Sequence, residues 1–172
     1  MKYVECPEEC YGAGPDITLF LAGGITNCPN WQQEMVTRLS DSQLTLVNPR
    51  RKIWKDGDAV EQIKWEHRHL TRCDAVLFWF PSETVCPITL PGGPVWLMYE
   101  LGAWAFRPKK IFVGCHPNYN RKLDVEIQVG LERVNLVVVS SIQDLAQQVL
   151  DWNARKELNR FHRDTDQPGG VK

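Results

Sequence analysis

A single carboxylate stands in an otherwise apolar stretch of the chain. Glu100 lies in WLMYELGAWAF, residues 96–106, where the other ten residues are apolar or glycine. On a helix, Trp96 and Trp104 would fall on the same side as Glu100, and apolar side chains would cover the remaining sides. Ionised carboxylates are rarely buried without a partner. Glu100 is therefore either a structural glutamate, paired with an arginine or with backbone amides, or a nucleophile or general base tuned by its apolar surroundings.

Two more acidic residues precede Glu100 in the chain. Glu66, in KWEHRHLTRCD, lies at the edge of a predicted buried helix face. The residues predicted for this face are Val60, Ile63, His67 and Leu70. Two carboxylates that converge on one sugar can cleave a glycosidic bond, because one attacks the anomeric carbon while the other handles the proton of the leaving group. By itself, Glu66 also fits a solvated helix residue, and Asp74 also fits a residue that holds loop amides at a strand start.

A glycine-rich turn, AGGITNCPN, joins a predicted strand to a predicted helix. Gly23 and Gly24 would let backbone amides approach a sugar or a phosphate near the helix N-terminus, although a plain tight turn also accounts for them. The turn is not the GxGxxG of dinucleotide-binding folds, and no acidic residue follows the next strand, which disfavours a Rossmann oxidoreductase. The chain also lacks the P-loop pattern GxxxxGK[ST], which argues against a phosphotransferase.

Two arginines follow the second predicted strand, in the segment NPRR. A guanidinium at this point can hold a phosphate or a carboxylate in a two-pronged contact. Arg50 and Arg51 could also be solvated loop residues or part of a subunit interface. We expect one of them, Arg50, to face the ligand, with Asn48 or Arg50 near its base or phosphate.

The spacing of apolar residues predicts a doubly wound α/β fold. Compact apolar segments predict strands at 17–23, 44–47, 75–80, 110–114 and 135–139. Helices are predicted at 31–39, 59–72 and 141–152, and around Glu100. The first begins at Asn30, with Gln33 completing a capping-box-like start, and buries Trp31, Met35 and Leu39. Alternating strands and helices indicate a five-stranded, mainly parallel sheet with helices on both faces.

The predicted topology also locates a ligand site. In such sheets, ligands bind beyond the carboxyl ends of the strands, at the topological switch point. The segments at this edge are 23–30, 48–58 and 81–95. Glu100 follows the last of these segments, so its carboxylate could reach the ligand crevice while its helix stays buried.

The chain reads as one domain with two irregular ends. We expect an irregular arm at 1–16, the folded domain at 17–156 and a polar tail at 157–172. A net charge of −1 gives no reason to expect a nucleic-acid polymer or an anionic membrane as partner. No apolar run has the length of a membrane span, and MKYVECPEEC lacks the apolar core of a signal peptide. The sequence therefore predicts a soluble, cytoplasmic protein.

The six scattered cysteines predict free thiols rather than a disulfide framework. A metal site is not expected, since there is no CxxC pair, and His67 and His69 diverge on their helix.

The ordered set FLAGGIT, VNPRR, WE, CDAVLFWF, PITL and YELGAW resembles the nucleoside 2-deoxyribosyltransferase-like superfamily. This group includes bacterial deoxyribosyltransferases and deoxynucleoside-monophosphate N-glycosidases, and the resemblance covers about residues 17–140. It implies a flavodoxin-like fold, no metal or organic cofactor, and a homodimer or a larger even-numbered homo-oligomer, with HPNYNRKLDVEIQ near the interface or rim.

By this resemblance, Glu100 is the nucleophile that attacks C1′ and forms a covalent glycosyl-enzyme. Glu66 matches an acid that handles the proton of the departing base or contacts that base, eight positions before Asp74. The turn that cradles the sugar, or a 5′-phosphate, is matched by Gly23, Gly24, Ile25 and Thr26.

The chain departs from the family pattern on the approach to Glu100. The segment PITLPGGPVWLMYE replaces the shorter Gly-x-Gly-x-Glu, and Glu83 would have to serve as the second acid before the nucleophile. We therefore expect cleavage or transfer of the N-glycosidic bond of a nucleoside or nucleotide, with base, sugar and acceptor left open. The alternative is a non-catalytic nucleotide sensor in which Glu100 contacts a ribose hydroxyl.

Overall fold

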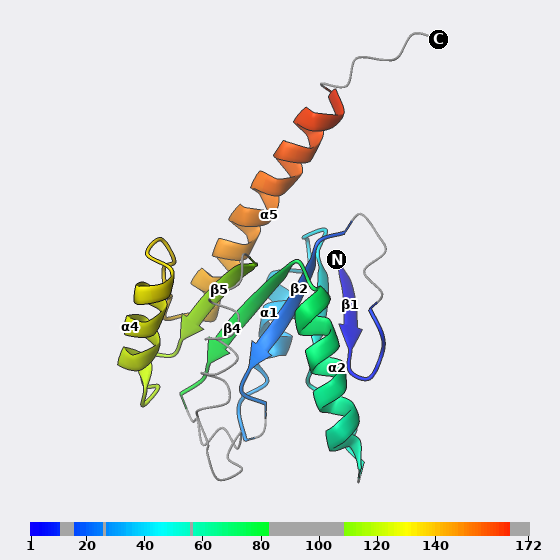
Figure 1. Ribbon diagram of the computed structural model, residues 1–172, viewed down its shortest axis with the longest axis vertical. Helices are drawn as coiled ribbons and strands as arrows, with labels where there is room; N and C mark the ends of the chain where they lie inside the picture. Colours follow the sequence, from blue (N-terminus) through cyan, green and yellow to red (C-terminus); the bar gives the residue numbers. More distant parts are fainter. Residues whose placement is uncertain (11–15, 26, 56, 83–108, 166–172) are drawn as a thin grey trace.

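Five strands form one fully parallel sheet in the computed structural model, which describes residues 1–10, 16–25, 27–55, 57–82 and 109–165. The strands are β1 (Lys2–Glu5), β2 (Thr18–Gly23), β3 (Thr45–Asn48), β4 (Ala75–Phe80) and β5 (Lys110–Cys115). Their order across the sheet is β1-β3-β2-β4-β5, as Figure 1 shows. The predicted α/β architecture is confirmed. Every residue of β4 is buried, as its unbroken run AVLFWF predicted.

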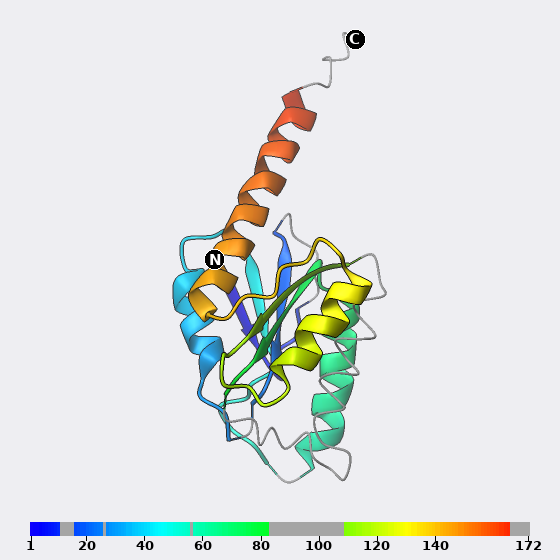
Figure 2. The same cartoon turned by 90° about the vertical axis from the view of Figure 1, so that its left-hand side faces the viewer.

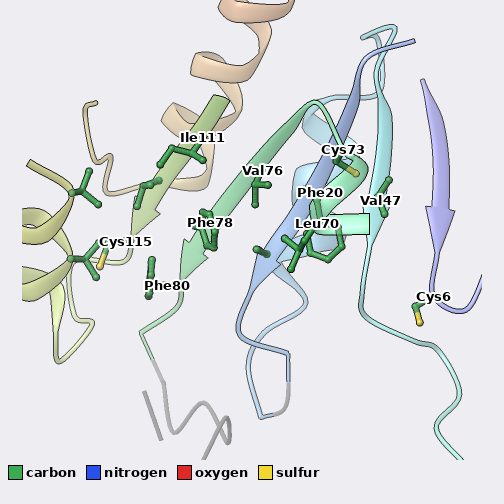
Figure 3. Packing of buried hydrophobic residues seen from close by; sticks show 14 of the residues in the cluster. Cys6, Phe20, Val47, Leu70, Cys73, Val76, Phe78, Phe80, Ile111 and Cys115 are labelled. Atoms are coloured by element: carbon green, nitrogen blue, oxygen red, sulfur yellow. The ribbon is translucent and has the colours of Figure 1, made fainter. Parts of the chain in front are cut away.

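Helices cover both faces of the sheet (Figures 1 and 2). On one face, α2 (Asp58–Arg72) and α4 (Lys122–Glu132) pack over side chains such as Phe20 and Phe78. On the other face, α1 (Trp31–Arg38) and α5 (Ile142–Thr165) pack over Leu19, Leu21 and Leu77. Successive residues of β2 thus enter opposite cores because strand side chains alternate between the two faces. Figure 3 shows the first of these cores, with Leu70 of α2 beside Phe20.

The sheet has the strand order of a flavodoxin-like fold once the edge strand β1 is set aside. The chain passes from β2 through α1 to β3 on one side, and from β4 to β5 on the other. The direction of winding therefore reverses between β2 and β4, which lie side by side. This is the switch point at which such folds bind ligands, at the carboxyl ends of the strands.

The first helix agrees with its prediction in detail. The side chain of Asn30 accepts a hydrogen bond from the backbone N–H of Gln33, at 3.2 Å. Trp31, Met35 and Leu39 are all buried against the sheet. A local cap and a 3-4 spacing of apolar residues were sufficient to predict this element.

Two of the strand predictions were wrong. Residues 2–5, which were assigned to an irregular arm, form β1 and pair in parallel with β3, from Lys2 beside Thr45 to Glu5 beside Asn48. Segment 135–139 is not a strand, because only Val139 bridges to β5, opposite Gly114. Its β-branched residues favour a strand locally, but the chain path brings only its last residue beside the sheet. The sheet therefore gains its fifth strand at the opposite edge.

The buried face of α2 also differs from the prediction. Val60 and Ile63 are 61% and 63% exposed, and His67 is exposed as well. The residues that α2 buries are Gln62, Trp65, His69 and Leu70. Apolar periodicity failed here because two of the buried residues are polar and satisfy their hydrogen bonds inside the fold, which allows the large Trp65 ring to face the core.

The last helix extends beyond its predicted end. It was expected at 141–152, and α5 instead continues to Thr165, into the segment predicted as a polar tail. Its C-terminal half projects away from the sheet (Figures 1 and 2). Within the described parts of the chain, no helix combines the length and the apolar character that crossing a membrane requires.

His69 ties the N-terminal segment to α2. It is 1% exposed and stacks on Trp65, with ring centroids 4.0 Å apart. Its Nδ1 lies 2.8 Å from the carbonyl oxygen of Trp65, and its Nε2 accepts the backbone N–H of Cys10 at 3.1 Å. These two contacts together require a neutral imidazole with its proton on Nδ1. Burial lowers the pKa of His69, against the opposing effect of Glu9.

We predict that acid destabilises the fold through His69. The pKa of His69 in the folded state lies below the unfolded value of about 6.5. Its contribution to the free energy of unfolding is therefore fully present above about pH 6.5 and is lost as the pH falls below that value. The free energy of unfolding in urea, measured at about pH 7.5 and about pH 5.5, should fall at the lower pH. His69→Gln should reduce this fall, whereas His67→Gln, at an exposed position of the same helix, should keep it. An unchanged pH dependence in His69→Gln would contradict the assignment.

Candidate functional site

The glycine-rich turn leaves the sheet at the switch point. Gly23, the last residue of β2, pairs with Trp79 of β4. A Cβ atom at Gly23 would lie 2.4 Å from the carbonyl oxygen of Trp79 and 2.6 Å from the ring of Trp31. Only glycine fits this approach. The Trp31 indole also donates to the carbonyl oxygen of Gly24 at 2.9 Å, so α1 and the turn are held together.

Arg50 holds the same turn from the side of β3. Its Nη2 donates to the carbonyl oxygens of Ile25, Cys28 and Pro29 at 2.7, 3.1 and 3.2 Å. Burial lowers the pKa of Arg50, and its buried Nε finds no hydrogen-bond partner among the described residues. Arg50, which was expected to contact a ligand, therefore uses its Nη2 to hold the turn against which that ligand would lie.

Both polar atoms of the Asn48 side-chain amide form hydrogen bonds within the protein. Nδ2 donates to the Tyr3 hydroxyl at 2.7 Å, and Oδ1 accepts the backbone N–H of Arg50 at 2.9 Å. The residue is buried at the carboxyl end of β3. Asn48 therefore joins β1 to the exit of β3 and helps to orient Arg50.

Arg51 points toward α2. Its Nη1 lies 2.9 Å from Asp58 and its Nη2 lies 2.7 Å from Glu61, while Nε donates to the Gln62 side chain at 2.7 Å. The Arg51 side chain is 5% exposed. The two neighbouring arginines thus serve different segments, since Arg50 binds the turn after β2 and Arg51 binds α2.

Glu66 is a half-buried carboxyl on the inner side of α2. The amide of Gln62, one turn earlier, donates to its Oε1 at 2.6 Å. Burial raises the pKa of Glu66, and the Gln62 hydrogen bond and the charge of Arg51 oppose this effect. A carboxyl with a raised pKa keeps its proton closer to neutral pH, which is what a general acid requires.

Asp74 lies at the other end of the strands, just before the amino end of β4. Its carboxylate accepts the backbone N–H and the hydroxyl of Thr18 at 2.8 and 2.7 Å, and the Asp74 N–H donates back to that hydroxyl at 3.0 Å. These contacts join the amino ends of β2 and β4, roughly 15–20 Å along the strands from Gly23. Asp74 therefore has the structural arrangement that the sequence also allowed, and the fold does not bring it together with Glu66.

Three of the predicted site residues lie outside the described part of the chain. They are Glu100, Glu83 and Thr26, together with most of the loop 81–95. The pocket proposed around Glu100 therefore stays a prediction. Within the described residues, no cluster of three or more histidine, cysteine or acidic side chains could hold a metal ion. Among these residues, Cys6, Cys10, Cys73 and Cys115 are buried free thiols.

The sequence missed Gln62 and Cys6 as members of the site. The thiol of Cys6 donates to the Gln62 side-chain oxygen at 3.0 Å, across 56 positions of sequence. Gln62 could have been found, because it precedes Glu66 by four residues and therefore shares its side of the helix. No local pattern links Cys6 to α2.

The fold and the site define the class of the protein before any comparison. It is a flavodoxin-like α/β protein with a glycine-rich turn at the strand-order switch point between β2 and β4, where proteins of this fold bind ligands, and with a partly buried carboxyl on α2. A comparison with family models then identifies the particular group. The model described as nucleoside 2-deoxyribosyltransferase like matches residues 16–119, and the chain belongs to this family. The match runs from the residues before β2 to those after β5, so β1, α4 and α5 lie outside it. No match was found among curated proteins.

The contacts of Arg50 predict that Arg50→Met loosens the turn after β2. The methionine keeps most of the apolar stem but loses hydrogen bonds from a charged donor, each worth about 1–3 kcal/mol. Amide hydrogen exchange at Ile25, Asn27 and Cys28 should accelerate about 10-fold or more. Arg38→Met, which removes an exposed arginine paired with Glu34 on α1, should leave exchange in the turn unchanged. Equal exchange rates in Arg50→Met and the wild type would show that the turn is held by other contacts.

Proposed function

We propose that the protein cleaves or transfers the N-glycosidic bond of a nucleoside or a nucleoside monophosphate, with Glu100 as nucleophile and Glu66 as acid. The observation that carries this proposal is the Glu66 carboxyl: its pKa is raised by burial, and one of its oxygens is held by Gln62. It occurs in a chain of the nucleoside 2-deoxyribosyltransferase-like family, in the helix that leads into the central strand β4. Reactions of this kind need one carboxylate to attack and one carboxylic acid to protonate.

The proposed reaction has two steps. The Glu100 carboxylate attacks C1′ while the C1′–N bond breaks, and the departing base receives the bonding electrons and the proton of Glu66. This leaves a glycosyl ester on Glu100 and a Glu66 carboxylate. Water or a second base then attacks C1′, gives up a proton to Glu66 and releases Glu100. Both half-reactions use only carboxylates and the acceptor, so the proposal includes no metal or organic cofactor.

The substrate would lie against the turn after β2. The close packing of Gly23 on Trp79 lets the backbone of Gly24 and Ile25 run past the carboxyl end of the sheet, where its amides could contact a sugar or a 5′-phosphate, and Thr26 would contribute to the same contact. Asn48 and Arg50 would support this wall from the side of β3, and Glu83 would stand near the leaving base. Asp74 is not among the residues proposed to bind the substrate, since its carboxylate holds Thr18 at the amino ends of the strands.

We predict that Glu100→Gln abolishes base release without unfolding the protein. The amide is isosteric but lacks the attacking oxygen, so activity should fall by at least about 10³-fold. Release of free base from a panel of deoxynucleosides and monophosphates measures this directly. Intact mass should reveal a glycosyl adduct with a slow 2′-fluoro nucleoside in the wild type and none in the variant.

Two results would speak against this mechanism. Turnover that persists in a well-folded Glu100→Gln protein would exclude the covalent step. Tight nucleotide binding by the wild type without any base release would instead indicate a sensor of the same fold.

We also propose that the protein forms a homodimer or a larger even-numbered homo-oligomer through α4. Leu123, Ile127 and Leu131 recur every four residues on this helix and are 67%, 52% and 76% exposed. The opposite side of α4 buries Val125 and Val129, so the helix is apolar on two sides. A helix with a second apolar side fits one that packs against another chain, and a closed dimer places the same patch on both copies.

We predict that Ile127→Lys lowers the mass of the assembly in solution. A charge in the centre of a self-complementary apolar patch must be buried twice in a two-fold interface, which disfavours association. Sedimentation or light scattering at micromolar concentration measures the mass. Ile63→Lys, at an exposed apolar position on α2, should leave the mass unchanged. A wild-type protein that is already monomeric would refute the proposed interface.

A further inference from the structure

One buried side chain connects three separate segments beside the proposed acid. Gln62 of α2 contacts Cys6, which follows β1, and Pro49 and Arg51, which follow β3. It also contacts Glu66 on its own helix. Cys6 lies just past the carboxyl end of β1 in Figure 3, at the same edge of the sheet as the glycine-rich turn. Gln62 is only 7% exposed, so water has little access to replace these hydrogen-bond partners.

Its four hydrogen bonds determine which way the amide points. The Oε1 atom of Gln62 accepts from Arg51 Nε at 2.7 Å and from the Cys6 thiol at 3.0 Å. The Nε2 atom donates to the Pro49 carbonyl oxygen at 2.7 Å and to Glu66 Oε1 at 2.6 Å. A flipped amide would set its N–H groups against two donors and its oxygen against two acceptors, so only one orientation is possible.

The acceptor side of the amide is held by groups that keep their protons. Burial raises the pKa of the Cys6 thiol to about 11, so it remains an S–H donor at neutral pH. Arg51 is fixed in turn by Asp58 and Glu61, with N–O distances of 2.9 and 2.7 Å. Gln62 therefore presents a rigid N–H donor to Glu66, because its other end cannot rotate without breaking bonds to a charged group.

We propose that Gln62 is a positioning residue for Glu66, which holds Oε1 of the carboxyl and so assigns the transferable proton to Oε2. This inference rests on the function proposed above, in which Glu66 protonates the departing base. An N–H that already occupies Oε1 disfavours a proton on that oxygen, since two hydrogens would then face each other. The carboxyl is consequently kept in one rotamer, with one oxygen available to donate.

Removal of Gln62 should therefore alter the titration of Glu66 as well as its orientation. The N–H of Gln62 favours the charged form of Glu66, and without it the raised pKa should rise further. Gln62→Met removes the donor and the acceptor together. Gln62→Glu keeps an acceptor for Arg51 and Cys6 but places a second acid against Glu66, which should raise its pKa by repulsion.

The test combines a titration with kinetics. The ¹³C resonance of the Glu66 carboxyl, assigned by its loss in Glu66→Gln, reports the pKa of this group without any turnover. In Gln62→Met and Gln62→Glu it should titrate at higher pH than in the wild type. In base release, Gln62→Met should lower kcat by about 10-fold or more with KM changed by less than about 3-fold, and the alkaline limb of the pH profile should move upward.

A matched control separates positioning from a general effect on stability. Gln147 on α5 makes the same kind of bond, with Nε2 donating to Asp151 four residues later at 2.8 Å, on an exposed surface. Gln147→Met should leave the titration of Glu66, kcat and the pH profile unchanged.

The outcomes distinguish this inference from the function on which it rests. If Gln62→Met melts at a lower temperature but Glu66 titrates as in the wild type, Gln62 is structural only and the inference is overturned. If the wild type releases no base, the proposed function fails. In that case an upward shift in the titration still supports control of Glu66 by Gln62, and an unchanged titration overturns it.

Discussion

The close packing of β2 on β4 at the switch point is the constraint on which the site depends. Gly23 lies so near the carbonyl oxygen of Trp79 and the ring of Trp31 that a single added carbon would collide with both. This contact brings the central strands, the turn and the start of α1 into one unit. The turn can lie directly across the strand ends only because no side chain intervenes. Where Gly23 lies, the described surface at this end of the sheet is therefore backbone.

The residues at the end of β3 and just after it hold both the turn after β2 and helix α2 in place. Asn48 orients the backbone of Arg50, whose guanidinium binds three carbonyl oxygens of the turn after β2. The next residue, Arg51, binds α2 through Asp58, Glu61 and Gln62. The side chains of these two consecutive residues point in different directions, so Arg50 contacts the turn after β2 and Arg51 contacts α2. Their hydrogen bonds and ion pairs fix the turn after β2 and the start of α2 relative to the end of β3, and rigid positioning of this kind is a general requirement of precise binding sites.

The environment of Glu66 connects this rigidity to chemistry. Burial favours its neutral form, whereas the Gln62 N–H and the charge of Arg51 favour its ionised form. A group balanced in this way can give up its proton and take it back within one reaction cycle. The bonds that hold α2 to the segment after β3 therefore also influence the protonation of Glu66.

The sequence by itself determined those features that depend on neighbouring residues. The apolar run of β4, the Asn30 cap with its 3-4 apolar spacing, and the glycine turn between a strand and a helix all follow from local patterns and indicate the α/β class. The ordered set of short motifs, from FLAGGIT to YELGAW, indicated the family. Only the tertiary structure decided which face α2 buries, that residues 2–5 join the sheet, and that Asp74 holds the far edge while Gln62 reaches Glu66. The physical reason is that burial of a polar side chain requires partners, and these partners come from distant parts of the chain, such as Cys6, 56 positions from Gln62. Periodicity records hydrophobicity along one helix and carries no information about hydrogen bonds that the rest of the fold supplies.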